Sequence, residues 1–312
     1  MRRKIDPNKK VTIKIGGKDR LEFKLKKVLV PPGTKISLKK DYDPDFTDGY
    51  KDKDAARDHV EENVNRLSDL QEKLYAQDSY SLLLVFQAMD AAGKDGTIRH
   101  VMSGVNPQGC HVTSFKAPSA EELDHDYLWR IAKALPARGM IGIFNRSHYE
   151  EVLVVRVHPE YLQGQKLPPE ASGKDIWERR FDQINAFEKR LVENGTVILK
   201  FFLNVSKEEQ KERFLDRINE PDKNWKFSIA DYKERGFWDD YQDAIEDMLN
   251  NTSTPWAPWF VIPADHKWFM RLAVSETICR TLEGLDLKFP EVSKARKKEL
   301  QEIKKLMEKE DD

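Results

Sequence analysis

From Tyr80 onward the chain alternates short apolar runs with amphipathic stretches of helical period. Strands separated by helices need crossover connections, which make the strands parallel and cover both faces of the sheet. The pattern therefore predicts an α/β fold with three layers around a parallel sheet. The predicted strands are 81–87, 111–115, 140–145, 196–205 and 259–264, and the predicted helices are about 94–104, 120–135, 175–194, 207–218 and 266–284.

The segments on either side of this region do not show the same alternation of apolar runs and amphipathic stretches. Residues 11–40 alternate loosely and then meet Pro31-Pro32-Gly33, which predicts a small β element that ends in a turn. A helix is expected over about 54–76, and the charged C-terminal tail has helical character. We divide the chain into a basic extension (1–50), a core (51–286) with a lid at about 212–240, and an exposed tail (287–312).

Charge is distributed unevenly along the chain. The net charge is −1, but residues 1–40 hold 14 Lys and Arg against three acidic residues, which leaves −12 for the remainder. A basic arm on an acidic body can hold a polyanion, or it can dock on the body. A solvated extension explains the charge equally well, so the three interpretations stay open.

Several classes of protein do not fit the sequence. No apolar run approaches the roughly 18 residues of a membrane span, and the first ten residues lack the apolar core of a signal peptide. Two cysteines are too few for a disulfide scaffold or a zinc site. The acidic body, with aromatics that look like core, argues against nucleic acid as a partner. We expect a cytoplasmic protein with neither a membrane nor a nucleic-acid partner.

The stretch QAMDAAGKDGT (87–97) follows the first predicted strand and opens a helix. It keeps the P-loop spacing between Ala88 and Gly93-Lys94, but Ala88 replaces the first glycine and Asp95 replaces the Ser or Thr. Backbone N–H groups at a helix start attract anions, and Lys94 adds a positive charge. Asp90 and Asp95 beside a phosphate would repel it unless a metal ion intervenes, so magnesium belongs to the prediction.

A second polar loop, NRSHYEE, begins at Asn145 where the third predicted strand ends. Parallel strands deliver functional residues at their carboxyl ends, so this loop should lie beside the P-loop. Arg146 is suited to bidentate phosphate binding. For His148 we favour a partly buried, hydrogen-bonded ring, because the sequence supplies neither a nucleophile partner nor metal-ligand spacing.

The sequence of residues 212–236 predicts a mobile basic lid of the kind that closes over phosphates and excludes water. Pro221 breaks the preceding helix, and we expect Trp225 and Phe227 to form a small core for the loop. A solvated helix end with balancing acids is the alternative. The basic residues of the segment are Arg213, Arg217, Lys223, Lys226 and Arg235.

Together these stretches resemble the polyphosphate kinase 2 family over about residues 50–286. The motifs that carry the resemblance are FQAMDAAGKDGTI (86–98), SFKAPSAEELDHDYLWR (114–130), GIFNRSHYEEVLVVRVHP (142–159), WKFS (225–228) and PWAPWFVIPADHKWFMR (255–271). The resemblance implies a P-loop kinase-like fold with a lid, and magnesium-dependent transfer of phosphate between inorganic polyphosphate and a nucleotide. The string NRSHYE resembles the class III subgroup, which phosphorylates nucleoside mono- and diphosphates.

The resemblance also assigns roles to residues. Asp90 and Lys94 match the Walker A acid and lysine, and Arg146 follows the Walker B position, so these three are the predicted catalytic residues. The expected cofactor is Mg²⁺, and the expected substrates are polyphosphate with adenine and guanine nucleotides, in a homodimer or homotetramer. The predicted nucleotide or phosphate ligands are Ala91, Ala92, Gly93, Asp95, Gly96, Lys116, Arg130, Asn145 and Glu150; the polyphosphate ligands are Arg213, Arg217, Lys226 and Arg235; the metal ligands are Asp90, Asp95 and Glu150.

Two other functions remain open. An ATP-dependent nucleoside monophosphate kinase would share the fold and the P-loop but would not need a long basic groove. A non-catalytic module that binds a nucleotide or polyphosphate would not need both Lys94 and Arg146.

Overall fold

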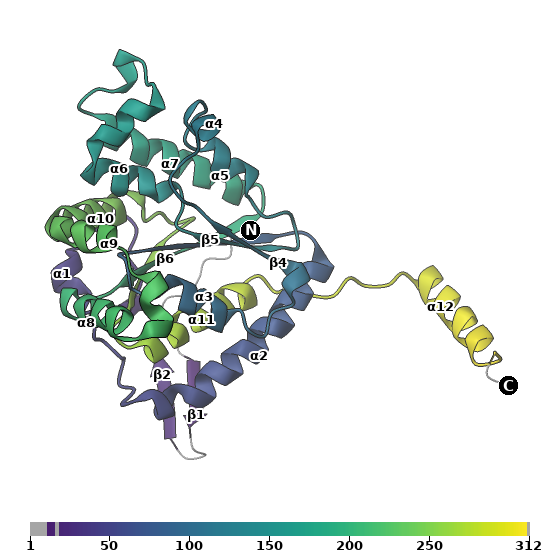
Figure 1. Cartoon of the computed structure of the whole chain (residues 1–312). Coiled ribbons are helices and arrows are strands. Elements are labelled where there is room, and N and C mark those ends of the chain that lie inside the picture. The colour runs from purple at the N-terminus through teal and green to yellow at the C-terminus, as the bar shows by residue number, and fades with distance from the viewer. Residues whose placement is uncertain (1–10, 16–18, 311–312) are drawn as a thin grey trace.

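Five parallel strands form one sheet at the centre of the molecule, as the alternating pattern predicts (Figure 1). The computed structural model describes residues 11–15 and 19–310. The strand order is β4-β5-β3-β6-β7, so the strands that precede the two polar loops, β3 and β5, are neighbours. The strands are β3 (Ser81–Ala88), β4 (Cys110–Ser114), β5 (Ile141–Asn145), β6 (Thr196–Asn204) and β7 (Trp259–Pro263).

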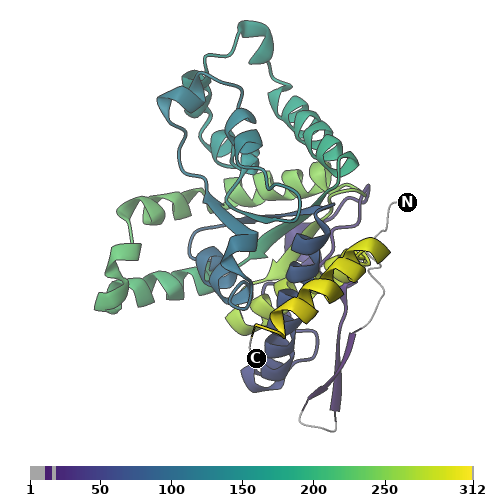
Figure 2. The same cartoon turned by 90° about the vertical axis from the view of Figure 1, so that its right-hand side faces the viewer.

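Helices cover both faces of the sheet, which gives three layers (Figure 1). One layer contains α2 (Lys53–Gln77), α3 (Lys94–Val101) and α11 (Lys267–Glu283), and α11 packs against both of the others. The opposite layer contains α5 (Trp129–Lys133), α6 (Val154–Val157), α7 (Ile176–Glu193) and α10 (Trp238–Thr252). The α8 (Lys207–Asn219) and α9 (Ile229–Glu234) helices reach away from the sheet as the green segment of Figure 2.

The predicted helix at 120–135 is interrupted. The structure has α4 (Ala120–Leu123) and α5 with a turn between them. A capping box between Ser119 and Glu122 starts the first helix. The Asp126 carboxylate then accepts a hydrogen bond from the Leu128 N–H at 2.9 Å, and this local bond stabilises a turn in place of a continuous helix.

The N-terminal segment docks on the body from residue 23 onward, which is one of the three interpretations above. Leu25, Val28 and Val30 are fully or almost fully buried. Val28 and Val30 exchange backbone hydrogen bonds with the edge strand β7, at 2.7 and 2.9 Å. This pairing covers one edge of the sheet. The preceding hairpin pairs β1 (Val11–Ile15) with β2 (Asp19–Phe23), and the basic residues within 1–10 and 16–18 lie outside the described part of the chain.

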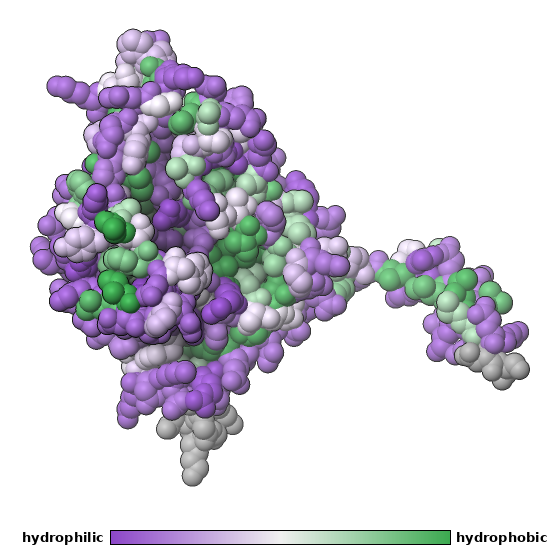
Figure 3. All heavy atoms as spheres, in the orientation of Figure 1, coloured by the Kyte–Doolittle hydropathy of each residue, from purple (hydrophilic) through white to green (hydrophobic). Residues whose placement is uncertain are grey.

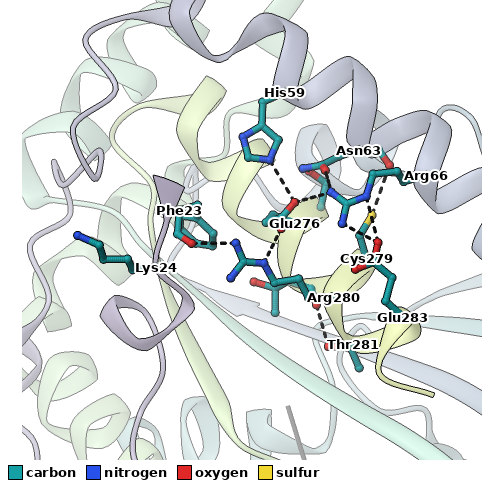
Figure 4. Close-up of polar contacts among 12 residues, drawn as sticks. Phe23, Lys24, His59, Asn63, Arg66, Glu276, Cys279, Arg280, Thr281 and Glu283 are labelled. Atoms are coloured by element: carbon teal, nitrogen blue, oxygen red, sulfur yellow. Dashed lines mark hydrogen bonds and ion pairs between the residues drawn. The ribbon is translucent and has the colours of Figure 1, made fainter. Parts of the chain in front are cut away.

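A buried carboxylate, Glu276 of α11, connects the N-terminal segment, through Arg280, to α2 (Figure 4). Its oxygens accept hydrogen bonds from Arg66 at 2.8 Å and Arg280 at 2.5 Å, and lie 3.1 Å from His59 Nε2. Arg280 also donates to the Phe23 carbonyl. Burial alone would raise the pKa of Glu276, but the bond from His59 and the two arginine charges lower it to about 2. The carboxylate is therefore ionised in the folded protein at neutral pH.

The C-terminal tail contains a helix, α12 (Lys294–Met307), at the end of an extended arm (Figure 1). None of its residues is buried, and its apolar side chains lie on the surface (Figure 3). Within the described residues, no helix combines the length and the apolarity that a membrane span requires.

Candidate active site

The turn between β3 and α3 has the backbone of an anion-binding loop. Ala91 and Gly93 both have positive φ, at 60° and 107°, and α3 begins directly afterwards at Lys94. Gly93 needs to be glycine, because its φ is unfavourable for other residues and a Cβ there would lie 3.2 Å from Met270 Cε. The turn therefore leads directly into a helix start, where free N–H groups attract phosphate.

The ammonium group of Lys94 lies against this turn. Its Nζ donates to the Ala88 carbonyl at 2.8 Å. Burial lowers the pKa of Lys94, while the Asp90 carboxylate acts in the opposite direction. Lys94 and Asp90 both line an open cleft of about 570 Å³ at the carboxyl edge of the sheet, and Figure 3 shows a hydrophilic hollow on the face that carries α3, α8 and α9.

The loop after β5 meets the P-loop, as the sequence predicts. Arg146 has φ +62°, and its N–H donates to the Phe86 carbonyl on β3 at 3.0 Å. Its guanidinium lies 3.2 Å from the Asp90 carboxylate. Burial alone would lower the pKa of Arg146, but the charges of Glu150 and Asp90 raise it. A residue held in a sparsely populated backbone region beside the P-loop fits a functional position.

A second contact joins the same two loops. Asn145 Nδ2 donates to Asp95 Oδ1 at 2.5 Å. Glu150 lies further back, where its Oε1 accepts from Gln87 Nε2 at 2.9 Å. Glu150 is not among the residues that line the cleft, whereas Asp90, Asp95 and Asn145 are.

A buried polar cluster holds the loop after β5 in place. The Nε2 of His148 lies 3.3 Å from Glu188 Oε1, which confirms the predicted hydrogen-bonded ring, and the ring is fully rather than partly buried. The Tyr149 hydroxyl donates to the same carboxylate at 2.8 Å. The Lys200 ammonium on β6 donates to Glu188, to the Tyr149 oxygen and to the Thr252 carbonyl at 2.7–2.8 Å. Sequence reasoning missed Lys200, which sits in an apolar strand with no local signal for its partners.

The second half of α8 and the segment after it, where the sequence predicts a lid, form another wall of the cleft. Arg217 donates to the Lys226 carbonyl at 3.2 Å and lies 3.7 Å from Asp231. Burial raises the pKa of Asp231, with a further contribution from Asp90. Phe227 packs edge-on against Phe214. The expectation for Trp225 was wrong, because its side chain is 79% exposed and lies beside Lys226 instead of forming a core.

Two predicted polyphosphate ligands have other partners. Arg213 is buried and donates to the carbonyls of Ala91, Ala92 and Ala264 at 2.6–3.1 Å, so it supports the P-loop. Arg235 donates to the Lys207 carbonyl and to Gln210 Oε1, both at 2.7 Å, and does not line the cleft. Contact of either side chain with polyphosphate remains a prediction that this arrangement does not favour, because the protein already uses the donors of Arg213 and the Nη1 of Arg235, which lies away from the cleft.

The remaining predicted ligands divide between the cleft and its surroundings. Lys116 faces the cleft, and Arg130 supports it by donating to the Lys116 carbonyl at 2.8 Å. Lys267 and Asp231 also line the cleft and were missed, although Lys267 follows the end of a strand, where functional residues are expected. The predicted site residues that line the cleft are Asp90, Ala91, Gly93, Lys94, Asp95, Gly96, Lys116, Asn145, Arg146, Arg213, Arg217 and Lys226; those that do not are Ala92, Arg130, Glu150 and Arg235.

The carboxylates that line the cleft suit magnesium better than they suit a metal ion whose ligands all come from the protein. Among the described residues, no group of three or more His, Cys, Asp or Glu side chains is arranged to hold a metal ion. Magnesium usually binds through one or two carboxylates together with water and substrate phosphates. Asp90 and Asp95 supply such carboxylates in the cleft, at and just after the turn between β3 and α3.

The chain is similar to known proteins of one family. The model of the family described as polyphosphate kinase 2 matches residues 50–290. The chain is 51% identical over 288 residues to an ADP-polyphosphate phosphotransferase of Rhodopseudomonas palustris, covering 92% of this chain and 99% of the relative. It is 45% identical over 275 residues to an AMP/ADP-polyphosphate phosphotransferase of Meiothermus ruber, covering 88% and 98%.

A solved structure is also similar. The crystal structure of polyphosphate kinase 2 from Arthrobacter aurescens TC1 has a TM-score of 0.79 and 43% sequence identity to this chain, and the match covers 87% of this chain and 94% of that one.

Proposed function

This chain belongs to the polyphosphate kinase 2 family and transfers phosphate between polyphosphate and a nucleotide, and we propose that it uses Mg²⁺ and accepts AMP as well as ADP. The observation that best supports this proposal is the convergence of Lys94, Arg146 and Arg217 on one cleft. The cleft thus brings a helix start and cations from three parts of the chain to one place, as transfer between two phosphate compounds requires.

Positioning and charge stabilisation account for the chemistry in this proposal. The N–H groups at the start of α3 and the Lys94 ammonium hold the transferring phosphate, and Arg146 binds its oxygens. Bound magnesium would neutralise charge that develops on the phosphates. Asp90 and Asp95 are the carboxylates placed to hold the ion or its waters, and Arg146 keeps Asp90 oriented. Transfer is direct and in line, without a covalent enzyme intermediate.

The acceptor range follows from the position of the carboxylates. Many members of the family that the sequence resembles have an Asp at the Walker B position, where this chain has Asn145, and Glu150 supplies a carboxylate a few residues later, behind Arg146. AMP lacks the second phosphate that ADP offers to a metal ion. Glu150 lies behind Arg146 and does not line the cleft, so in this proposal its charge compensates for the missing phosphate from a distance. The similarity to an AMP/ADP-polyphosphate phosphotransferase supports the same assignment.

A donor-exchange assay tests the proposal. AMP and ADP are incubated separately with polyphosphate as the sole phosphate donor, and AMP is also incubated with ATP as the sole donor. Each reaction is run with Mg²⁺ and with chelator, and the nucleotides are separated by chromatography. We expect ADP and ATP to form only when Mg²⁺ is present. Turnover of AMP with ATP but not with polyphosphate would identify a nucleoside monophosphate kinase, and binding without turnover would identify a non-catalytic module.

Guanine nucleotides and self-association belong to the same proposal. We expect GMP and GDP to be accepted in the same assay and the chain to form a homodimer or homotetramer, which light scattering coupled to size-exclusion chromatography measures directly. A monomer at assay concentration would contradict the second expectation.

A further inference from the structure

A group of cations continues from the cleft along two neighbouring helices. Gly96 on α3 and Lys267 on α11 both line the cleft. One helical turn further, Arg99 and His100 follow Gly96, and Arg271 follows Lys267. Residues three or four apart lie on the same face of a helix, about 5–6 Å from each other. Because α3 packs against α11, the three side chains extend one side of the cleft outward as a cationic surface.

In the part of the chain that the structure describes, no acidic side chain is paired with these three. Among the described residues, Arg99, His100 and Arg271 form no side-chain hydrogen bond or ion pair. The Nε of Arg271 is buried without a hydrogen-bond partner. Elsewhere on α11, Arg280 donates to a carboxylate and to a carbonyl. A partly buried guanidinium with an unused donor is unusual, because such donors are normally satisfied.

The cations also oppose one another. Burial lowers the pKa of His100, and the charges of Arg271 and Arg99 lower it further. Burial and the charge of Arg99 likewise lower the pKa of Arg271. Like charges held together without a counter-charge destabilise the folded protein, and an anion bound between them removes that cost.

We propose that Arg99, His100 and Arg271 form a subsite for internal phosphates of the polyphosphate chain, which runs from the cleft past Lys267 along α3 and α11. This inference rests on the proposed function. Every internal phosphate of such a polymer carries a negative charge, so a chain whose end lies at Lys94 needs cations along its exit. The three side chains are all basic, so the surface that they form suits phosphates and not a nucleobase.

Polyphosphate donors of different length distinguish binding at this subsite from binding in the cleft. The double variant Arg99→Gln/Arg271→Gln of the full chain is compared with the wild type, using tetrapolyphosphate and a polymer of about one hundred phosphates as alternative donors. Removing two phosphate contacts should raise KM for the long polymer at least about fivefold, with kcat unchanged, and reduce its salt dependence. KM for tetrapolyphosphate, which occupies the cleft alone, should change less than about twofold.

Two further variants complete the experiment. Arg99→Lys/Arg271→Lys keeps both charges and should restore most of the affinity for the long polymer, which a purely structural role would not predict. Lys294→Gln/Lys297→Gln removes two charges from the projecting helix α12 and should leave both KM values unchanged. An equal rise for short and long donors, or the same rise in the α12 control, would overturn the subsite. Failure of the wild type to use either donor would instead overturn the proposed function.

Discussion

The guanidinium of Arg146 lies 3.2 Å from the carboxylate of Asp90, and this ion pair joins the loops that follow the neighbouring strands β3 and β5. A second bond, from Asn145 to Asp95, joins the same loops. The side chains that we propose to contact the phosphates are thus held in place relative to one another by the protein itself, and such preorganisation is a main source of catalytic rate.

The first prediction concerns Lys94. The variant Lys94→Ala should lower kcat by about 10²- to 10³-fold, because the ammonium stabilises charge on the transferring phosphate. Melting temperature should change little, because Lys94 lies in the wall of the cleft and not in the apolar core. Initial rates with ADP and polyphosphate measure the effect, and a folded variant with near wild-type kcat would show that the active site lies elsewhere.

The second prediction concerns the basic residues of the predicted lid. Arg217→Gln or Lys226→Gln should raise KM for polyphosphate more than KM for ADP, and the difference should shrink at high salt. Lys211→Gln is a suitable control, since Lys211 is an exposed residue of α8 that does not line the cleft. Equal rises for both substrates would argue against a polymer-binding lid.

The third prediction is that Glu150 affects the choice between AMP and ADP as the phosphate acceptor. Glu150→Asn should reduce the rate with AMP more than the rate with ADP, measured at saturating polyphosphate and Mg²⁺. Glu150→Gln removes the charge but keeps an oxygen for the Gln87 amide, so it should have the same selective effect if the charge is what matters. Equal losses for AMP and ADP would reject the role of Glu150 without changing the family assignment.

The fourth prediction concerns the buried pair of Lys200 and Glu188. Lys200→Met should lower the free energy of unfolding by about 3–5 kcal/mol, because it leaves the Glu188 carboxylate buried without its ammonium partner. Lys200→Met/Glu188→Leu should be more stable than the single variant, because no buried charge remains unpaired. Urea denaturation measures both, and additive losses would contradict the explanation.

Acid stability provides the fifth prediction. Glu276 has its pKa lowered from 4.5 to about 2, so its contribution is fully present above about pH 4.5 and is lost as the pH falls through 2. The contribution is about 3 kcal/mol, from 1.4 kcal/mol per pKa unit. Urea denaturation between pH 5 and 2 should show a steeper loss of stability for the wild type than for Glu276→Gln.

The sheet and the two polar loops at its carboxyl edge could be predicted because their signals are local. Each apolar run became a strand, with ends that shifted by one residue at most, and the P-loop spacing placed Lys94 at the first residue of α3. Parallel topology then required the loop at Asn145 to lie near Asp95, as it does.

The partners of charged side chains could not be predicted, because they come from distant parts of the chain. Arg213 is one of several basic residues in the lid sequence, yet its guanidinium binds carbonyls more than 50 residues away in both directions. Lys200 shows the same limit, because its partners Glu188, Tyr149 and Thr252 lie on three other segments. Sequence distinguishes a basic residue from an apolar one, but not a buried donor from a free one.

The bonds of Arg213 have a mechanical consequence for the lid. They fasten the middle of α8 to the P-loop and to the residues that follow β7. The first half of that helix is therefore anchored to the sheet, and any hinge must lie beyond Arg213. Pro221 and the short 3-10 helix that it begins lie beyond this anchor, so a closing movement there would swing only the outer segment and leave the turn between β3 and α3 undisturbed.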